Sequence, residues 1–448
     1  MLGSYGRASD GHPAGIWRTV LFKALVSAFR TPDLRRKLLF TMLIMAIYRL
    51  GTYLPAPFVS YSNVKQCLDQ QGGADLLTMM NMFSGGALLQ LSVFALGIMP
   101  YITSSIIVQL MRVVIPRFEE LHKEGQSGQA KLTEYTRYLT IFLAVLQASV
   151  MVSIANSQLF PLCNLDPIPN ASPWKYLITI LTVTAGTALV MWLGEQITER
   201  GVGNGMSLLI FTGIAASFPA MLTNVYQSDG GVSRLLIVLA MFLAITLVVV
   251  FVEQSQRRIP VQYAKRVVGR RTYGGTSTYI PIKINMANVI PVIFASSILA
   301  LPQMLTQFGD PNAGWVQWLS LNFAPTSGWY LLAYALLIIF FAFFYTSITF
   351  NPEEIADNMK RYGGFVPGIR AGQPTADYLR YVINRINWVG ALYLATIALI
   401  PQIVFNAMGI QSMAFGGTSI IILVGVGLQT VKDIDAQLQQ RHYEGFLR

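Results

Sequence analysis

Seven basic residues lie in one polar stretch between two apolar segments of membrane length. They are Arg257, Arg258, Lys265, Arg266, Arg270, Arg271 and Lys283. Their chemistry is anion binding, since guanidinium groups hold carboxylates and phosphates through paired hydrogen bonds. Such a loop at one membrane face is a docking surface for an RNA backbone or for the acidic groove of a protein. The alternative is a solvated loop that only sets the topology and contacts anionic lipid.

A second polar stretch, residues 351–385, has the same two interpretations. Its turn-forming residues predict a rigid tip and are Gly363–Gly364, Pro367–Arg370 and Gly372–Pro374. Arg370 follows Pro367 and Gly368, so we expect its guanidinium to point outward. In the first stretch, the alternation over Arg271–Ile282 predicts a projecting β-ribbon capped by Gly274 and Gly275.

The sequence offers few residues suited to catalysis or to metal binding. All three histidines, His12, His122 and His442, fall outside the apolar segments. A Ser, Cys or Thr nucleophile inside those segments would have no base within reach, and no Walker-type phosphate-binding sequence occurs. The apolar segments contain almost no charged residues, and Arg49 lies near the end of one. This scarcity of ionisable groups disfavours transport coupled to protons or sodium ions. We therefore expect no enzyme activity and no cofactor.

Two weaker signals concern glycines and cysteines. Gly201–Gly205 could cradle a phosphate, but it follows an apolar segment and lacks a lysine, which favours a flexible helix start. Cys67 and Cys163 fall on the outer side of the topology described below, where a disulfide is chemically allowed. Two outer loops need not meet, however, so both the paired and the unpaired state stay open.

The composition is that of a polytopic membrane protein, because 53% of the 448 residues are hydrophobic and only 12% are charged. Membrane-spanning helices must therefore position these loops. A spanning helix needs about 20 mostly apolar residues. The chain offers ten such segments, at Leu38–Leu54, Val93–Met111, Tyr138–Gln158, Tyr176–Leu193, Met206–Leu222, Leu235–Val252, Ile284–Thr306, Trp329–Phe350, Asn387–Phe405 and Phe415–Val431.

The distribution of charge sets the expected orientation. With both termini in the cytoplasm, 28 of the 32 Lys and Arg residues fall on the cytoplasmic side. We therefore expect an all-α polytopic membrane protein of two five-helix halves, the second inverted relative to the first. The boundaries are an extension at 1–37, halves at 38–222 and 223–431, cytoplasmic loops at 253–283 and 351–385, and a tail at 432–448.

One outer segment, residues 76–90, is neither an ordinary span nor an ordinary loop. It is apolar and rich in Met, but it is short and broken by Gly85 and Gly86. Such a segment is either re-entrant and sheltered inside the protein, or an amphipathic helix lying on the membrane surface.

Five strings of this sequence resemble the SecY family, the central subunit of the general secretory protein-conducting channel. They are Phe94–Gln109, Gly194–Phe211, Gln256–Ser297, Asn351–Pro374 and Gly416–Thr418. The resemblance covers nearly all ten spans in order, with each string on the expected side. The chain departs from the family pattern in its extension, Met1–Trp17, and in its sparse outer-loop chemistry.

The resemblance implies an hourglass pore between the two halves. The implied waist is a ring of Ile98, Ile102, Ile210, Ile214, Ile293 and Ile422, and the spacing of four in the first two pairs places each pair on one helix face. The implied plug is a re-entrant helix at 76–90, centred on Met82, Phe83, Ser84, Gly85, Gly86, Ala87 and Leu88. A lateral exit to lipid would have spans two and three on one side and spans seven and eight on the other. The polar residues facing this seam would be Thr103, Ser104, Gln109, Asn288 and Ser297.

The implied function is to translocate unfolded secretory polypeptides across the bacterial cytoplasmic membrane and to release membrane-protein segments laterally into it. The implied partners are SecE and SecG, the motor ATPase SecA, the ribosome, signal peptides and membrane lipids, with the basic loops facing the motor and the ribosome. Two other classes stay open. A secondary transporter would need a midplane charge or a polar pocket, and a lipid flippase or intramembrane scaffold would have a permanently packed waist.

Overall fold

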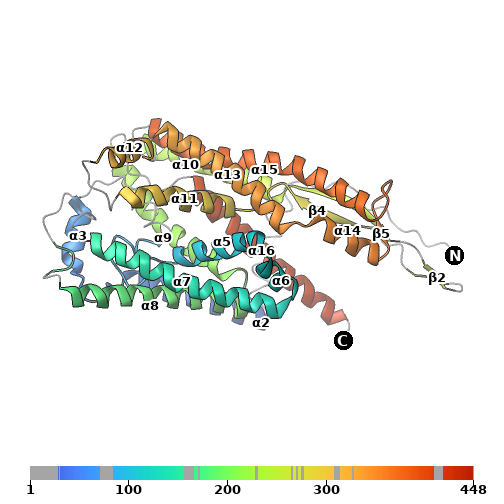
Figure 1. The fold of residues 1–448 in the computed structure, drawn as a ribbon, viewed down its shortest axis with the longest axis horizontal. Helices are drawn as coiled ribbons and strands as arrows, with labels where there is room; N and C mark the ends of the chain where they lie inside the picture. The colour runs from blue at the N-terminus through green and yellow to red at the C-terminus, as the bar shows by residue number, and fades with distance from the viewer. Residues whose placement is uncertain are drawn as a thin grey trace.

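The computed structural model describes residues 29, 31–70, 84–155, 166–169, 172–227, 231–263, 266–268, 271–273, 277–306, 313–324, 327–407 and 417–446. It is an elongated bundle of roughly parallel and antiparallel helices (Figure 1). The short helices α3 (Tyr61–Gln70) and α12 (Gly314–Asn322) lie at one end, and all the strands lie at the other. The molecule therefore has two chemically distinct ends separated by apolar helices.

Each of the ten expected spans overlaps a helix. These helices are α2 (Pro32–Tyr53), α5 (Met99–Val114), α7 (Gln126–Ile154), α8 (Pro173–Arg200), α9 (Gly205–Gln227), α10 (Gly231–Gln254), α11 (Ile290–Thr306), α13 (Gly328–Thr349), α15 (Gln373–Ala407) and α16 (Gly417–Phe446). Two more short helices, α6 (Pro116–Lys123) and α14 (Pro352–Arg361), follow α5 and α13.

Among the described residues, six helices are long and apolar enough to cross a membrane: α7, α8, α9, α10, α13 with its continuation into α14, and α15. A seventh results if α5 and α6, bent by 98°, count as one span. The other three expected spans coincide with α2, which carries Arg49, with α11, which has 17 residues, and with α16, whose second half is charged.

Two spans begin later than predicted. The expected starts are Val93 and Ile284, but α5 begins at Met99 and α11 at Ile290. Each helix has a proline in its first turn, where the missing N–H has no helical partner to lose. The residues before α5 form consecutive turns, and both approaches contain left-handed backbone, at Leu91 (φ 47°) and Asn288 (φ 50°).

The first basic stretch forms the predicted projecting ribbon, but its pairing differs from the prediction. β1 (Gln256–Tyr263) pairs antiparallel with β4 (Ser277–Lys283), and β2 (Arg266–Val268) pairs with β3 (Arg271–Tyr273). The chain therefore reverses between Val268 and Arg271, because β3 and β4 bond to β2 and β1 and not to each other. The predicted cap, Gly274 and Gly275, lies outside the described residues.

The two cytoplasmic stretches expected from the sequence form one unit. β5 (Gly364–Phe365) from the second stretch adds to β1 and completes a sheet of order β4-β1-β5. Side chains of both stretches and of the start of α15 pack into one apolar cluster. Its buried members are Ile259, Val261, Ile282, Met359, Val366, Leu379, Val382 and Ile383. We call this assembly of β1, β4, β5, α14 and the first turns of α15 the basic unit.

A buried polar contact ties the basic unit to the helices. α10 extends to Gln254 and so includes Glu253, which is 8% exposed. The Nδ2 of Asn285 donates to Glu253 Oε1 at 2.6 Å and to the carbonyl oxygen of Asn288 at 3.2 Å. Asn285 thus fixes the segment between β4 and α11 against the end of α10.

We expect Asn285→Leu to lower the free energy of unfolding by about 2 kcal/mol, because it leaves the buried Glu253 carboxylate without its donor. Thermal or urea unfolding of the purified protein in detergent would measure the change. The control is Asn322→Leu on α12, where the amide donates only to the Trp318 carbonyl oxygen of its own helix and a change within about 0.5 kcal/mol is expected. Equal losses in the two variants would contradict a special role for Asn285.

Candidate functional site

The six isoleucines of the implied ring lie together in one apolar cluster. Ile98 immediately precedes α5, and the others come from α5, α9, α11 and α16, so both halves of the chain contribute. Five of the six are buried, and Ile102 is partly exposed and packed against them. Ile210 and Ile214 lie four residues apart within α9, whereas Ile98 is the residue before α5 and Ile102 lies in its first turn. The structure therefore gathers side chains that lie as far as 324 positions apart in the sequence.

The described part of the implied plug, Ser84–Gln90, is largely held inside the protein. Ser84, Ala87 and Leu88 are buried, whereas an amphipathic helix on the membrane surface would turn its apolar side chains to lipid. This part is a series of turns and not a helix, because Gly85 and Gly86 have left-handed backbone, at φ 68° and 93°. Met82, Phe83 and the rest of the expected plug helix before Ser84 lie outside the described residues.

Arg49 holds this segment from α2. Its Nη1 donates to the carbonyl oxygen of Gly85 and, at 3.4 Å, to Thr52 Oγ1, and its Nη2 donates to Tyr53 Oη at 2.6 Å. Gly85 also lies against α9, where a Cβ on it would meet Gly213 Cα at 3.1 Å. We call Arg49 and its contact with Gly85 the latch. The sequence carried one signal for it, namely a charge inside an apolar span.

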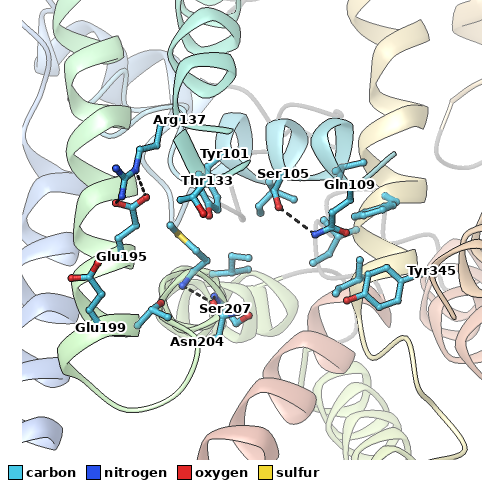
Figure 2. A pocket seen from close by; sticks show the side chains of 18 residues that line it. Tyr101, Ser105, Gln109, Thr133, Arg137, Glu195, Glu199, Asn204, Ser207 and Tyr345 are labelled. Carbon is cyan, nitrogen blue, oxygen red and sulfur yellow. Dashed lines mark hydrogen bonds and ion pairs between the residues drawn. The ribbon is translucent and has the colours of Figure 1, made fainter. Parts of the chain in front are cut away.

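A cavity of about 470 Å³ opens next to the ring. Ile102, Ile210 and Ile293 line it together with polar groups of α7, α8 and α9 (Figure 2). Across the cavity from Gln109 of α5, Arg137 of α7 pairs with Glu195 of α8, its Nε and Nη2 donating to the two carboxylate oxygens at 2.8 and 2.9 Å. Sequence reasoning missed this pair, since nothing local links residues 58 positions apart.

The polar residues of the implied lateral exit mostly bond within their own helices. The hydroxyls of Thr103 and Ser104 donate to the carbonyl oxygens of Met99 and Pro100, and that of Ser297 donates to the carbonyl oxygen of Ile293. Gln109 donates to Ser105 Oγ at 3.4 Å and lines the cavity. Asn288 contributes its carbonyl oxygen to Asn285. In the described part of the chain, the side-chain hydrogen bonds of these residues stay within α5 or within α11.

Three arginines of the basic unit are exposed. Arg257 and Arg258 lie on β1, and the guanidinium of Arg258 stacks over the Tyr279 ring at 4.8 Å. Arg370 lies at the predicted turn-rich tip, between Gly368 (φ 84°) and Gly372 (φ 104°), and its carbonyl oxygen accepts from Thr375 Oγ1 at 2.8 Å. Arg266 and Arg271 are on the paired β2 and β3, and Lys265 and Arg270 lie outside the described residues.

The glycine-rich turn at Gly201–Gly205 is a helix start and not a phosphate cradle. Three of its N–H groups already have acceptors: Gly201 donates to the Ile197 carbonyl oxygen, Val202 to Thr41 Oγ1 and Gly205 to Thr198 Oγ1. Asn204 Oδ1 caps α9 by accepting from the N–H groups of Met206 and Ser207. Cys163 lies outside the described residues, so the cysteine pairing stays a question from the sequence.

Comparisons with known proteins agree with this geometry. The family model SecY matches residues 92–431. A Streptomyces scabiei protein named "Protein translocase subunit SecY" is 58% identical over 437 residues, covering 96% of this chain and all of that protein. A Mycobacterium bovis protein of the same name is 54% identical over 443 residues, again covering 96% of this chain and all of that protein.

Solved structures share the fold. One, "The structure of a protein conducting channel", has a TM-score of 0.61 and 17% sequence identity and covers 89% of this chain and 91% of that chain. Another, "Sec61 in the Canine ribosome-channel complex from the endoplasmic reticulum", has a TM-score of 0.58 and 16% identity with the same coverage. With the family model and the curated relatives, these matches identify the chain as a member of the SecY family.

Proposed function

We propose that this chain is the protein-conducting channel of a bacterial translocase and not an enzyme. The observation that carries the proposal is that the six isoleucines, from both halves of the chain, share one apolar core cluster, that Ile102, Ile210 and Ile293 among them line a polar cavity, and that Arg49 holds Gly85 of the implied plug against α9. An aliphatic waist makes no directional bonds with a polypeptide, so any sequence can pass, while a narrow apolar neck resists wetting and ion flow. Unfolded secretory polypeptides cross through this waist, and membrane-protein segments leave between α5 and α11.

The partners follow from the two ends of the molecule. By family, the small subunits SecE and SecG complete the complex, and the motor ATPase SecA and the ribosome use the basic unit. Its exposed arginines support this assignment, since guanidinium groups bind both carboxylates and phosphates. Relatives of similar fold, described as a ribosome-channel complex and as a complex bound to the yeast ribosome, add support for a ribosome contact.

We place the chain in the cytoplasmic membrane with both termini and the basic unit inside. The excess of Lys and Arg on the side of the basic unit supports this orientation. Four exposed tryptophans mark the membrane interface at the end opposite the basic unit. They are Trp174, Trp315, Trp318 and Trp329, at the starts of α8 and α13 and on α12. The charged half of α16 lies toward the other end of the molecule, beyond α6 (Figure 1).

Reconstitution tests the proposed function. The chain is purified with its small subunits and placed in lipid vesicles, and a radiolabelled preprotein, the motor ATPase and ATP are added outside. We expect the preprotein to become resistant to added protease until detergent opens the vesicles. Uptake of a small solute with no preprotein protection would instead favour a secondary transporter, and lipid scrambling alone would favour a flippase.

The latch should keep the resting channel closed. We expect Arg49→Met to raise the ion conductance of resting vesicles about tenfold, because losing a charged hydrogen bond of about 1.5 kcal/mol shifts the segment toward its displaced position. The control is Lys175→Met, whose ammonium donates to the Pro169 carbonyl oxygen at 3.0 Å and does not contact the segment. An unchanged resting conductance in Arg49→Met would mean that the segment's other contacts, such as the Tyr48 hydroxyl donating to the Ser84 carbonyl oxygen and the packing against Gly213, hold it.

A further inference from the structure

The root of the basic unit is the point where the strands of the ribbon leave the helices. Ser255 alone separates the end of α10 from β1, and residues 284–289 connect β4 to α11. The N–H of Ile284 donates to the carbonyl oxygen of Ser255 at 3.2 Å and so joins the two connections. A displacement of the ribbon therefore reaches the end of α10 and the approach to α11 together.

Glu253 lies at the centre of this root. Its side chain is buried and accepts from Asn285 Nδ2, and its carbonyl oxygen accepts from Lys432 Nζ of α16 at 3.3 Å. Asn285, which is only 2% exposed, also donates to the carbonyl oxygen of Asn288, whose backbone is left-handed at φ 50°. Left-handed backbone is uncommon outside glycine, so the bonds of Asn285 help to fix the approach to α11 in one conformation.

Helix α15 also confines this approach. Gly390 lies so near the segment that a Cβ there would meet the carbonyl oxygen of Ile284 at 2.5 Å. An added methyl group would therefore displace either residues 284–289 or α15. Since the first turns of α15 belong to the basic unit, the sheet, α15 and the approach to α11 form one packed assembly.

The approach leads directly to the waist. α11 begins two residues after Asn288, and its side chains Ile290 and Ile293 line the cavity. Ile293 also belongs to the apolar cluster that contains the ring. Because Ile293 lies in the first turn of α11, a shift at the start of this helix carries Ile293 with it.

We propose that Glu253 is a positioning residue that makes the basic unit and the start of α11 move as one body. A partner docked on the basic unit thereby displaces Ile293 without touching it. The bond from Asn285 suits this task, because a hydrogen bond to a buried carboxylate is among the stronger ones in a protein and is costly to break. The inference rests on the proposed translocation function and names the residue through which docking reaches the waist.

The test measures the distance between the basic unit and α11 by pulsed electron paramagnetic resonance. Spin labels are attached to Thr278→Cys on β4 and Ile298→Cys on α11, two exposed positions, with Cys67 and Cys163 replaced by serine. The labelled protein is studied as the complete complex in lipid nanodiscs. We expect Glu253→Leu to make the distance distribution about twice as wide, because α11 can then take several positions relative to the ribbon.

A matched control distinguishes positioning from a general loosening of the fold. Thr41→Val also removes a buried hydrogen bond between two elements, since Thr41 Oγ1 accepts from the Val202 N–H at 3.3 Å, but it lies in the other half of the chain. Its distance distribution should stay narrow. An unchanged width in Glu253→Leu, or an equal broadening in Thr41→Val, would overturn the inference.

A reciprocal exchange covers the case in which Glu253→Leu does not fold. Asn285→Asp turns two carboxylates toward each other and should broaden the distribution. Adding Glu253→Gln returns an amide donor to the pair with the roles reversed, so about half or more of the broadening should disappear. A double variant as broad as Asn285→Asp alone would contradict the role of this bond.

The vesicle assay carries the test to function. Glu253→Leu should bind the motor ATPase and stay closed at rest as the wild type does, but import preprotein about tenfold more slowly, within the range of mutations that change the coupling between sites. Normal import, or a loss of motor binding that matches the loss of import, would refute the coupling. A wild-type complex that imports nothing would instead refute the translocation function.

Discussion

Replacing Ile98, Ile102 and Ile210 together by glycine should make the resting channel conduct ions. Ile98 and Ile210 are buried in the main apolar cluster, Ile102 packs against it, and Ile102 and Ile210 also line the cavity. Removing them widens the apolar neck, so that water enters and ions follow. A shift of only about 1.4 kcal/mol between the dry and the wet waist changes the open population tenfold, and we expect at least that increase in single-channel conductance events in planar bilayers.

The control for this variant must separate pore widening from helix damage, since each glycine costs a helix about 1 kcal/mol. Ile141, Ile237 and Ile403 are exposed by 42%, 52% and 52% on α7, α10 and α15 and do not line the cavity. Their triple glycine variant should stay closed. A waist variant that folds, assembles and conducts no more than this control would remove the three isoleucines from the pore.

Arg370→Glu should lower motor-driven translocation about a hundredfold or more. The guanidinium is exposed at a tip held by Gly368 and Gly372, and its planar fork can bind a carboxylate bidentately. Reversing the charge of such a contact costs about 2 to 5 kcal/mol. ATP-dependent import into reconstituted vesicles measures the loss, whereas membrane insertion and assembly with the small subunits should be unaffected.

Two further variants define the contact at Arg370. Arg370→Lys keeps the charge but not the fork, so its import rate should fall between those of the wild type and Arg370→Glu. Arg117→Glu makes the same charge change on α6, elsewhere on the expected cytoplasmic face, and should import normally. Normal import by Arg370→Glu would show that the tip only sets the topology.

Much of the architecture could be predicted from the sequence because a spanning helix is a local structure. Its backbone hydrogen bonds close within the segment, so apolar length alone indicates it. All ten expected spans overlap helices, and the six isoleucines fall in one apolar core cluster. The turn residues around Arg370 likewise predicted an exposed tip, because glycine determines backbone conformation locally.

Long-range contacts were decided only by the tertiary structure. The sequence predicted two separate basic loops, but β5 pairs with β1 and an apolar cluster joins them into one unit. The alternation around Gly274 predicted the ribbon but not its register, since register depends on which strands meet. The latch between Arg49 and Gly85 and the pairing of Arg137 with Glu195 have the same origin, because their partners lie 36 and 58 positions apart and only helix packing brings them together.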